Sequence, residues 1–437
     1  MKPVFRHRYP RTIHLPGGRG WDGFGKTNTG QAFARIEKGR RGRTPLGRGA
    51  WGAIPLLSTL LLLMLPAQAS PWVRSFVVTA YEPAFHYDSA GGDCPRGTVP
   101  DNDYARLLQT PWRSAADIAA LMKPDVPSIE PYLRLAPALH QRGFAAGIDT
   151  YINPFAAPDP GLPEVTGRIA DGFNLDGKTA TGFGVQGIDN GFYRALGCLA
   201  AFRGPPGQGT LNARANTRMQ EGLQTILIRL SGNASPDRDD AVTVEIGPSP
   251  DHLERNLAGV PLRDYSYRLV ASTAYTKLSG RIRDGVLTTA PVADLKAPDF
   301  AWSESNRGEA HFLRGRLQLK LTADGATGLI GGYRDWRALY ARLAFNVAVE
   351  GPFLEIPFHE NLIAIYYALA RNADAIPDAK GRNSAISTAY RLTALPAFAV
   401  DQPAPLAWVQ PPPSQRILQE RAAFARAAAG PSIMPSP

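Results

Sequence analysis

Apolar and polar residues alternate along short segments in the second half of the chain. Residues 225–230 place an isoleucine or leucine at every second position, and residues 242–246 repeat this alternation with valine and isoleucine. A period of two is typical of a strand that buries one face. The polar sequence SPDRDD at 235–240 separates the two segments, so the pattern predicts a β-hairpin.

The same signal recurs further along the chain. Residues 265–269 alternate, residues 281–288 carry Asp284-Gly285 in the middle, and residues 317–321 precede Asp324-Gly325. Asp-Gly between alternating segments is a strong hairpin signal. Several short strands without intervening helices favour an antiparallel sheet arrangement. The predicted fold class is therefore mainly β, an antiparallel β-sandwich or barrel, with helical additions (α+β overall).

Other segments predict additional elements. A strand is expected at 75–81 and another at 386–400. Helical spacing of apolar residues predicts helices at 104–108, 115–122, 131–141, 336–347 and 362–369. The apolar faces of the last two helices are expected to pack into the core.

The segment WGAIPLLSTLLLLMLPAQA at 51–69 resembles an export signal. Its apolar part is shorter than the roughly 20 residues of a membrane span, and it closes on a small-x-small pattern. We expect cleavage between Ala69 and Ser70, a periplasmic or extracellular location, and no transmembrane anchor in the mature form. The predicted organisation is a basic leader with signal peptide (1–69), an irregular region (70–205), a β-rich domain (206–400) and a Pro/Ala-rich tail (401–437).

The leader accounts for the positive charge of the chain. The whole chain has 48 basic and 38 acidic residues; residues 1–69 hold 12 of the basic ones and only Asp22 and Glu37 of the acidic ones. Residues 70–437 therefore carry 36 of each sign. A balanced chain offers no general attraction for polyanions, so nucleic acid is not an expected partner.

Two cysteines are present, Cys94 and Cys198. In an oxidising compartment, a pair of thiols predicts one disulfide. A catalytic thiol is the alternative, because sequence alone does not place the two residues within bonding distance.

Two glycine-rich segments match nucleotide-binding patterns. Residues 20–27, GWDGFGKT, match the phosphate loop, and residues 182–187, GFGVQG, match the dinucleotide fingerprint. Such loops work between a buried strand and a helix. The first lies in the leader, and the second has no acidic residue about 20 positions later. We therefore expect no nucleotide cofactor.

Residues 171–198 form the densest candidate site. Asn174, Asp176, Asp189 and Asn190 supply hard oxygen donors on glycine-bent loops, which suits Ca²⁺. The spacing does not fit an EF-hand, so a calcium site here would be irregular. The alternative is that these residues form turns.

A second candidate site is catalytic. Glu82, His86, Asp88 and Asp93 cluster near Cys94, and two carboxylates with an imidazole could serve a hydrolase. The alternative is a set of polar loop residues beside a disulfide. Other signatures fail: residues 359–363, HENLI, lack the second zinc-ligating histidine, and no G-x-S-x-G elbow occurs.

Three blocks resemble segments of a family of exported proteobacterial proteins: GGDCPRG at 91–97, GIDNGFYRALGC at 187–198 and GRNSAISTAYRLTALPAFAV at 381–400. The resemblance implies a shared architecture and an exported location, and it carries no activity.

These observations favour an exported binding or structural module over an enzyme. The expected module is non-catalytic, is stabilised by calcium, and has a carbohydrate or another cell-envelope component as its partner. The alternative is an extracytoplasmic hydrolase of a polymeric glycan that uses the carboxylate and histidine cluster at 82–93. Trp302, Tyr275 and Trp336 are candidates for stacking on sugar rings in either case.

Overall fold

The computed structural model describes residues 71–99, 113–123, 154–156, 158–270, 276–303, 307–350 and 362–402. The leader, the helices predicted at 104–108 and 131–141, Tyr275 and the tail after residue 402 lie outside these ranges.

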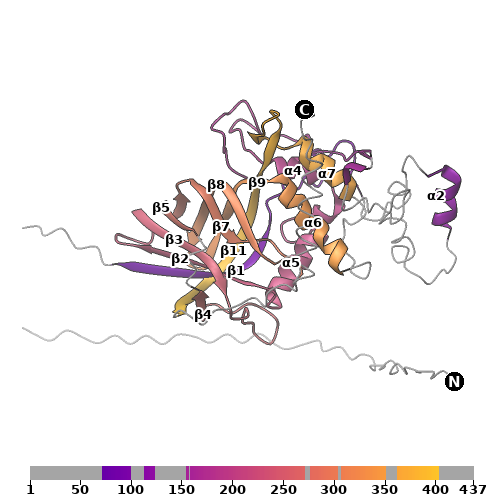
Figure 1. The fold of residues 1–437 in the computed structure, drawn as a ribbon. Helices are drawn as coiled ribbons and strands as arrows, with labels where there is room; N and C mark the ends of the chain where they lie inside the picture. Colours follow the sequence, from indigo (N-terminus) through magenta and orange to yellow (C-terminus); the bar gives the residue numbers. More distant parts are fainter. Residues whose placement is uncertain are drawn as a thin grey trace, which may run out of the picture. The chain divides into compact units, whose positions relative to one another are not determined.

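Eight strands close into an antiparallel β-barrel (Figure 1). Each strand pairs with the next, and the last pairs back with the first. In spatial order they are β1 (Trp72–Pro83), β2 (Thr225–Gly232), β3 (Asp239–Ser249), β5 (Lys277–Arg283), β6 (Val286–Thr289), β8 (Glu309–Thr322), β9 (Gly325–Asp335) and β11 (Asn383–Gln402). The predicted mainly β class is confirmed, and closure leaves the barrel itself without an edge strand.

Three further strands extend the sheet. β7 (Val292–Pro298) pairs with β8, and β10 (Ala375–Pro377) pairs with the start of β11. β4 (Tyr265–Val270) pairs with residues 397–402 of β11 in parallel, which differs from the antiparallel pairing expected of its alternating sequence. β11, 20 residues long, therefore contributes to the barrel wall and to two added strand pairs.

Period-two alternation places one apolar face of every barrel strand in a common core. All eight strands contribute to one buried cluster. Its barrel residues include Phe76, Val78, Ile228, Val244, Leu278, Ile282, Leu287, Leu319, Ile330 and Leu392. The barrel is thus packed with side chains along its interior, and a binding site must be sought outside it.

The two predicted Asp-Gly turns join adjacent barrel strands. Asp284 and Gly285 both adopt positive φ angles, 50° and 72°, between β5 and β6. This conformation matches the twist of a tight hairpin and favours Asp-Gly at these positions. Asp324-Gly325 joins β8 to β9.

Helices pack on the barrel at its β9 and β11 side. The predicted helices correspond to α2 (Ala115–Met122), α6 (Trp336–Glu350) and α7 (Leu362–Arg371). Two more, α4 (Gly191–Leu196) and α5 (Thr210–Gln220), were not predicted, and η1 (Pro154–Ala156) and η2 (Ala200–Phe202) are single 3₁₀ turns. Figure 1 shows α4, α6 and α7 grouped beside β9 and β11. All three helices contact β11, and α6 also contacts β9, whereas α5 contacts β1.

A buried ionic cluster fastens α6 to the barrel. Asp299 accepts hydrogen bonds from Arg334 of β9 at 2.6 and 3.0 Å, and Arg342 of α6 lies 2.8 Å from the same carboxylate. Although burial alone would raise the pKa of Asp299, the two guanidinium groups hold it below its ordinary value. Arg334 also donates to the hydroxyl of Tyr390 at 2.8 Å, so β7, β9, β11 and α6 are tied together.

Candidate functional site

The two cysteines form the predicted disulfide. Cys94 and Cys198 are bonded, with their Cα atoms 5.7 Å apart, so neither is a free thiol. Arg203 contacts the carboxylate of Asp93 beside the disulfide, and the hydroxyl of Tyr193 donates to Asp93 at 2.9 Å. Asp93 is thus paired in a buried structural network.

Glu82 is also engaged in structural contacts. It lies at the end of β1 with an exposed fraction of 3%. Its carboxylate accepts from the backbone N–H of Gly207 at 2.9 and 3.0 Å, from Asn216 at 3.1 Å and from Arg391 at 3.1 Å. These donors come from a loop, α5 and β11, so Glu82 joins three parts of the fold.

His86 does not meet the carboxylates predicted to work with it. Among the described residues, no hydrogen bond connects His86 to Glu82, Asp88 or Asp93. Asp88 accepts from the backbone N–H groups of Ala90 and Gly92 in a turn. The contacts of Glu82, Asp88 and Asp93 match the alternative of structural polar residues, and a catalytic role for this cluster stays a prediction.

The predicted calcium ligands hold the loop that carries them. Asp189 accepts from the N–H groups of Leu175 and Asp176, and Asp176 accepts from Lys178 N–H and the Thr181 hydroxyl. These bonds match the turn-forming alternative for both aspartates.

The two asparagines have similar structural contacts. Asn174 accepts from Gly177 and donates to two loop carbonyls, and Asn190 caps α4 by accepting from Tyr193 N–H at 3.0 Å. No cluster of three His, Cys, Asp or Glu side chains suited to a metal lies within the described ranges. Calcium binding stays a prediction.

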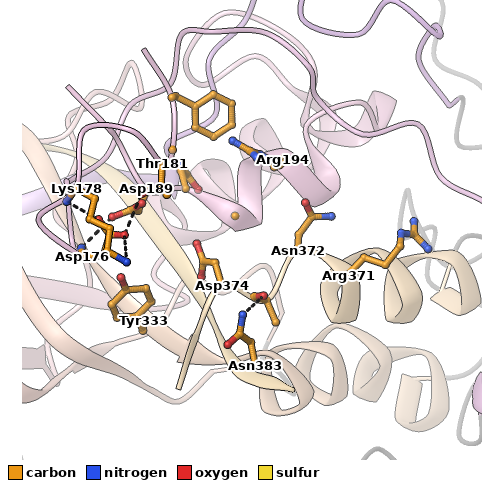
Figure 2. A pocket seen from close by; sticks show the side chains of 15 residues that line it. Asp176, Lys178, Thr181, Asp189, Arg194, Tyr333, Arg371, Asn372, Asp374 and Asn383 are labelled. Atoms are coloured by element: carbon orange, nitrogen blue, oxygen red, sulfur yellow. Dashed lines mark hydrogen bonds and ion pairs between the residues drawn. The ribbon is translucent and has the colours of Figure 1, made fainter. Parts of the chain in front are cut away.

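The same loop forms one wall of a cavity of about 380 Å³ (Figure 2). We call this the acidic pocket. The loop 176–183 and the start of α4 form one side, and β9 and the segment from α7 to β10 form the other. Its polar lining consists of Asp176, Lys178, Thr181, Asp189, Asn190, Arg194, Tyr333, Arg371, Asn372, Asp374 and Asn383.

Gly187 lies where the two sides of this loop approach each other closely, and no larger residue fits there. Its φ of 62° lies in the left-handed region, and a Cβ atom there would lie 2.1 Å from the carbonyl oxygen of Lys178. Only glycine permits this approach of the two loop strands. The closely packed loop positions Asp176 and Asp189 at the pocket.

Hydrogen bonds to β11 hold the opposite wall. The hydroxyl of Ser387 donates to Asp374 and accepts from the N–H of Gly191 at 2.6 Å. The N–H of Ser387 donates to the other oxygen of Asp374 at 2.8 Å. Ser387 therefore links the first residue of α4 to Asp374 and fixes the distance between the two walls.

Tyr333 of β9 is the most informative residue in the acidic pocket. The residue as a whole has an exposed fraction of 4%, but its hydroxyl is open to the cavity and forms no hydrogen bond with a described residue. Figure 2 shows the hydroxyl directed into the cavity, towards Asp176 and Lys178. Burial, followed by the negative charges of Asp189 and Asp374, raises the pKa of the phenol. The neutral hydroxyl is therefore available to a ligand as donor and acceptor.

Two carboxylates in the acidic pocket have raised pKa values. Burial raises the pKa of Asp189, which has an exposed fraction of 7%. Desolvation of its carboxyl group also raises the pKa of Asp374, although that residue as a whole is open to solvent. In contrast, Arg371 is neutralised by Asp159 and Glu164.

The sequence pointed to only part of this pocket. Asp176, Asp189 and Asn190 were among the predicted site residues, but Tyr333 and Asp374 were not. Tyr333 follows Gly331-Gly332 in a strand, where glycine marks a close backbone approach; that was the available signal. Trp302 and Trp336 are buried and do not offer stacking faces.

Comparison with protein-family models, with curated proteins and with solved structures finds no match to this chain. Among the described residues, no helix has the length and apolar character needed to span a membrane.

Proposed function

We propose that this protein is an exported, non-catalytic module that binds a small polar ligand from the cell envelope in the acidic pocket. The observation that carries the proposal is the hydroxyl of Tyr333, which opens to the pocket and forms no hydrogen bond with a described residue, although the rest of the side chain is buried. A ligand in the pocket can bond to this hydroxyl as donor or acceptor in place of water.

The rigidity of the pocket also supports binding. Most of its polar side chains are already fixed by bonds to the backbone, such as those of Asp189, Asn190 and Asp374. A ligand therefore meets groups that need little further ordering, which reduces the entropic cost of association. The disulfide supports export, because thiols are kept reduced in the cytosol of most organisms.

Replacing Tyr333 with phenylalanine tests the proposal. We expect the unliganded Tyr333→Phe variant to unfold within about 0.5 kcal/mol of the parent protein, because no hydrogen bond is lost. N-acetylglucosamine, glucosamine 6-phosphate and triglycine serve as envelope-type probes in thermal melts and calorimetry. A probe that raises the melting temperature of the parent should raise that of the variant less.

Tyr267→Phe is the matched control. The hydroxyl of Tyr267 accepts from Glu254 N–H outside the pocket, so its loss should lower stability and leave the probe-induced shift unchanged. Equal binding to the parent and Tyr333→Phe would contradict the proposed role of the pocket.

A glycan hydrolase is the second candidate, and Asp189 and Asp374 are the observation in its favour. Glycoside hydrolysis needs a protonated acid and a second, ionised carboxylate, and Asp189 and Asp374 are the candidates for this pair in one polar cavity. This pocket is a second location for such chemistry, besides His86 and its neighbours. Release of reducing ends from a polymeric glycan, abolished by Asp374→Asn while binding persists, would establish the hydrolase; no release by the parent protein supports the binding module.

A further inference from the structure

A second cavity adjoins the acidic pocket. It measures about 620 Å³ and shares Gly182, Phe183 and Arg194 with the first. We call it the arginine cavity. Its other lining residues are Arg96, residues 164–168, and Thr179, Ala180 and Gly184 from the glycine-rich loop at 171–190.

The arginine cavity contains positive charge that the described residues do not neutralise. Arg96, Arg168 and Arg194 line it, and none of them forms an ion pair with a described residue. Arg96 has only a long bond, 3.5 Å, to the carbonyl of Leu162. The one carboxylate in the lining, Glu164, accepts from Arg371 at 2.9 Å.

In the acidic pocket, two carboxylates have no ion pair with a described residue. Arg371 is paired with Asp159 and Glu164, and Lys178 lies 3.8 Å from Asp176. Asp189 and Asp374 form no ion pair with a described residue and are held by neutral donors. Arg194 lines this pocket too, and its positive charge acts on Asp189. Asp189 and Asp374 are thus the carboxylates in this pocket without an ion pair to a described residue, beside the hydroxyl of Tyr333.

Arg194 marks the junction of the two cavities. Its guanidinium carbon lies 4.5 Å from the centroid of the Phe183 ring, a cation–π contact that orients the side chain. A guanidinium group held in this way can still donate bidentately to a carboxylate or phosphate. Both cavities share this residue, so one ligand can contact the carboxylates on one side and the arginines on the other.

We infer that the two cavities form one site for a dipolar ligand, with an ammonium group in the acidic pocket and a carboxylate or phosphate in the arginine cavity. The inference deepens the proposed binding function and rests on it. Asp189, Asp374 and the Tyr333 hydroxyl receive the ammonium group, and Arg96, Arg168 and Arg194 receive the anionic group. An extended peptide covers at most about 3.6 Å per residue, so a short peptide or a phosphorylated amino sugar suits cavities of this size.

Matched probes separate the two charges. The peptide series is triglycine, N-acetyl-triglycine, which lacks the ammonium group, and triglycine amide, which lacks the carboxylate. The sugar series is glucosamine 6-phosphate, glucose 6-phosphate and glucosamine, with neutral N-acetylglucosamine as the uncharged reference. Calorimetry on the purified protein at low salt should show the doubly charged member of one series binding about tenfold or more tightly than either singly charged member. The series that shows the effect identifies the source of the ligand.

Arg168→Gln provides the variant test. The side chain of Arg168 is exposed and has no described partner, so its replacement should not disturb folding. It should weaken the binding of the doubly charged probe, with Arg96 and Arg194 retaining part of the effect of the anion, and it should not change the binding of the probe without an anion. Arg281→Gln, an exposed arginine on β5 without a described partner, should change neither.

The outcomes separate this inference from the function on which it rests. If N-acetylglucosamine binds in a manner that requires Tyr333, and charge and Arg168 have no effect, the dipolar ligand is wrong and the binding module stands. If no probe binds in a manner that requires Tyr333, both proposals are overturned. A third outcome would also overturn the assignment of the arginine cavity: the ammonium group and the anionic group each strengthen probe binding independently, and Arg168→Gln does not change that binding.

Discussion

Replacing Glu82 with glutamine decides whether this residue is structural or catalytic. The side chain is buried and serves donors from three parts of the fold: Gly207 N–H, Asn216 and Arg391. Glutamine has the same shape but offers one acceptor oxygen and one NH₂ group. Because the donors surround the carboxylate, the NH₂ group must face at least one of them.

The expected loss of stability follows from these contacts. Removing one partner of a buried ion pair costs about 3–5 kcal/mol. Arg391 keeps a second carboxylate, Asp171, at 2.6 Å, which moves the estimate to the lower end. We therefore expect Glu82→Gln to reduce the free energy of unfolding by about 3 kcal/mol.

Urea unfolding at pH 7, with the disulfide intact, measures this loss. The midpoint should fall while the slope of free energy against urea stays constant. Glu221→Gln is the control, because Glu221 forms an exposed pair with Arg218 at 3.2 Å and should lose about 0.5 kcal/mol or less. Equal losses for the two variants would refute the structural role. A variant of normal stability that loses a measurable hydrolytic activity would restore the catalytic interpretation.

Four further outcomes are expected. Reducing the Cys94–Cys198 disulfide, which spans 104 positions, should lower unfolding stability by up to about 4–5 kcal/mol in urea titrations; an unchanged midpoint would argue against this. Burial alone would raise the pKa of Asp93, but the neighbouring arginine and tyrosine hold it below its ordinary value. Its ionised form therefore stabilises the fold above about pH 4, and the penalty of Asp93→Asn should shrink as the pH falls below that value. Asp189→Ala should lower the melting temperature more with Ca²⁺ than with chelator if the predicted calcium site exists, and an equal loss in both would exclude it. Mass spectrometry of the exported protein should find an N-terminus at Ser70, whereas an intact leader would contradict the predicted cleavage.

The barrel strands were predictable because each carries its own signal. Alternation at 225–230 and 242–246 and the Asp284-Gly285 turn encode pairings between neighbours in sequence. Closure was not predictable in the same way, because β1 pairs with β11 more than 300 residues away in the chain. No local pattern distinguishes a sandwich from a barrel in that case.

The helix α5 was not predicted, because buried polar residues interrupt the apolar pattern along its sequence. Its buried face includes Asn212 and Asn216 between apolar residues, which breaks the apolar stripe that indicates a helix. Asn216 is buried because it bonds both to the N–H of Tyr81 and to Glu82. A polar residue with a tertiary partner is thus indistinguishable, in sequence, from an exposed one.

Prediction of the candidate site from the sequence has the same limitation. Asp176 and Asp189 were visible because they lie among glycines in one segment, whereas Tyr333 and Asp374 belong to a strand and a helix–strand connection. β11 brings these residues together: Ser387 lies opposite Tyr333 in the sheet and bonds to Gly191 and Asp374, and Arg391 bonds to Asp171.

The glycine-rich loop and the barrel are therefore energetically coupled through β11. Arg391 connects Glu82 of the barrel to Asp171 at the start of the loop, and Ser387 connects Gly191 of α4 to Asp374. A change at Glu82 should for this reason alter both barrel stability and the position of one pocket wall, although Glu82 does not line the pocket. Reduced probe binding by Glu82→Gln, measured where the variant is still fully folded, is the signature of that coupling. Unchanged binding would mean that Ser387 alone positions the wall.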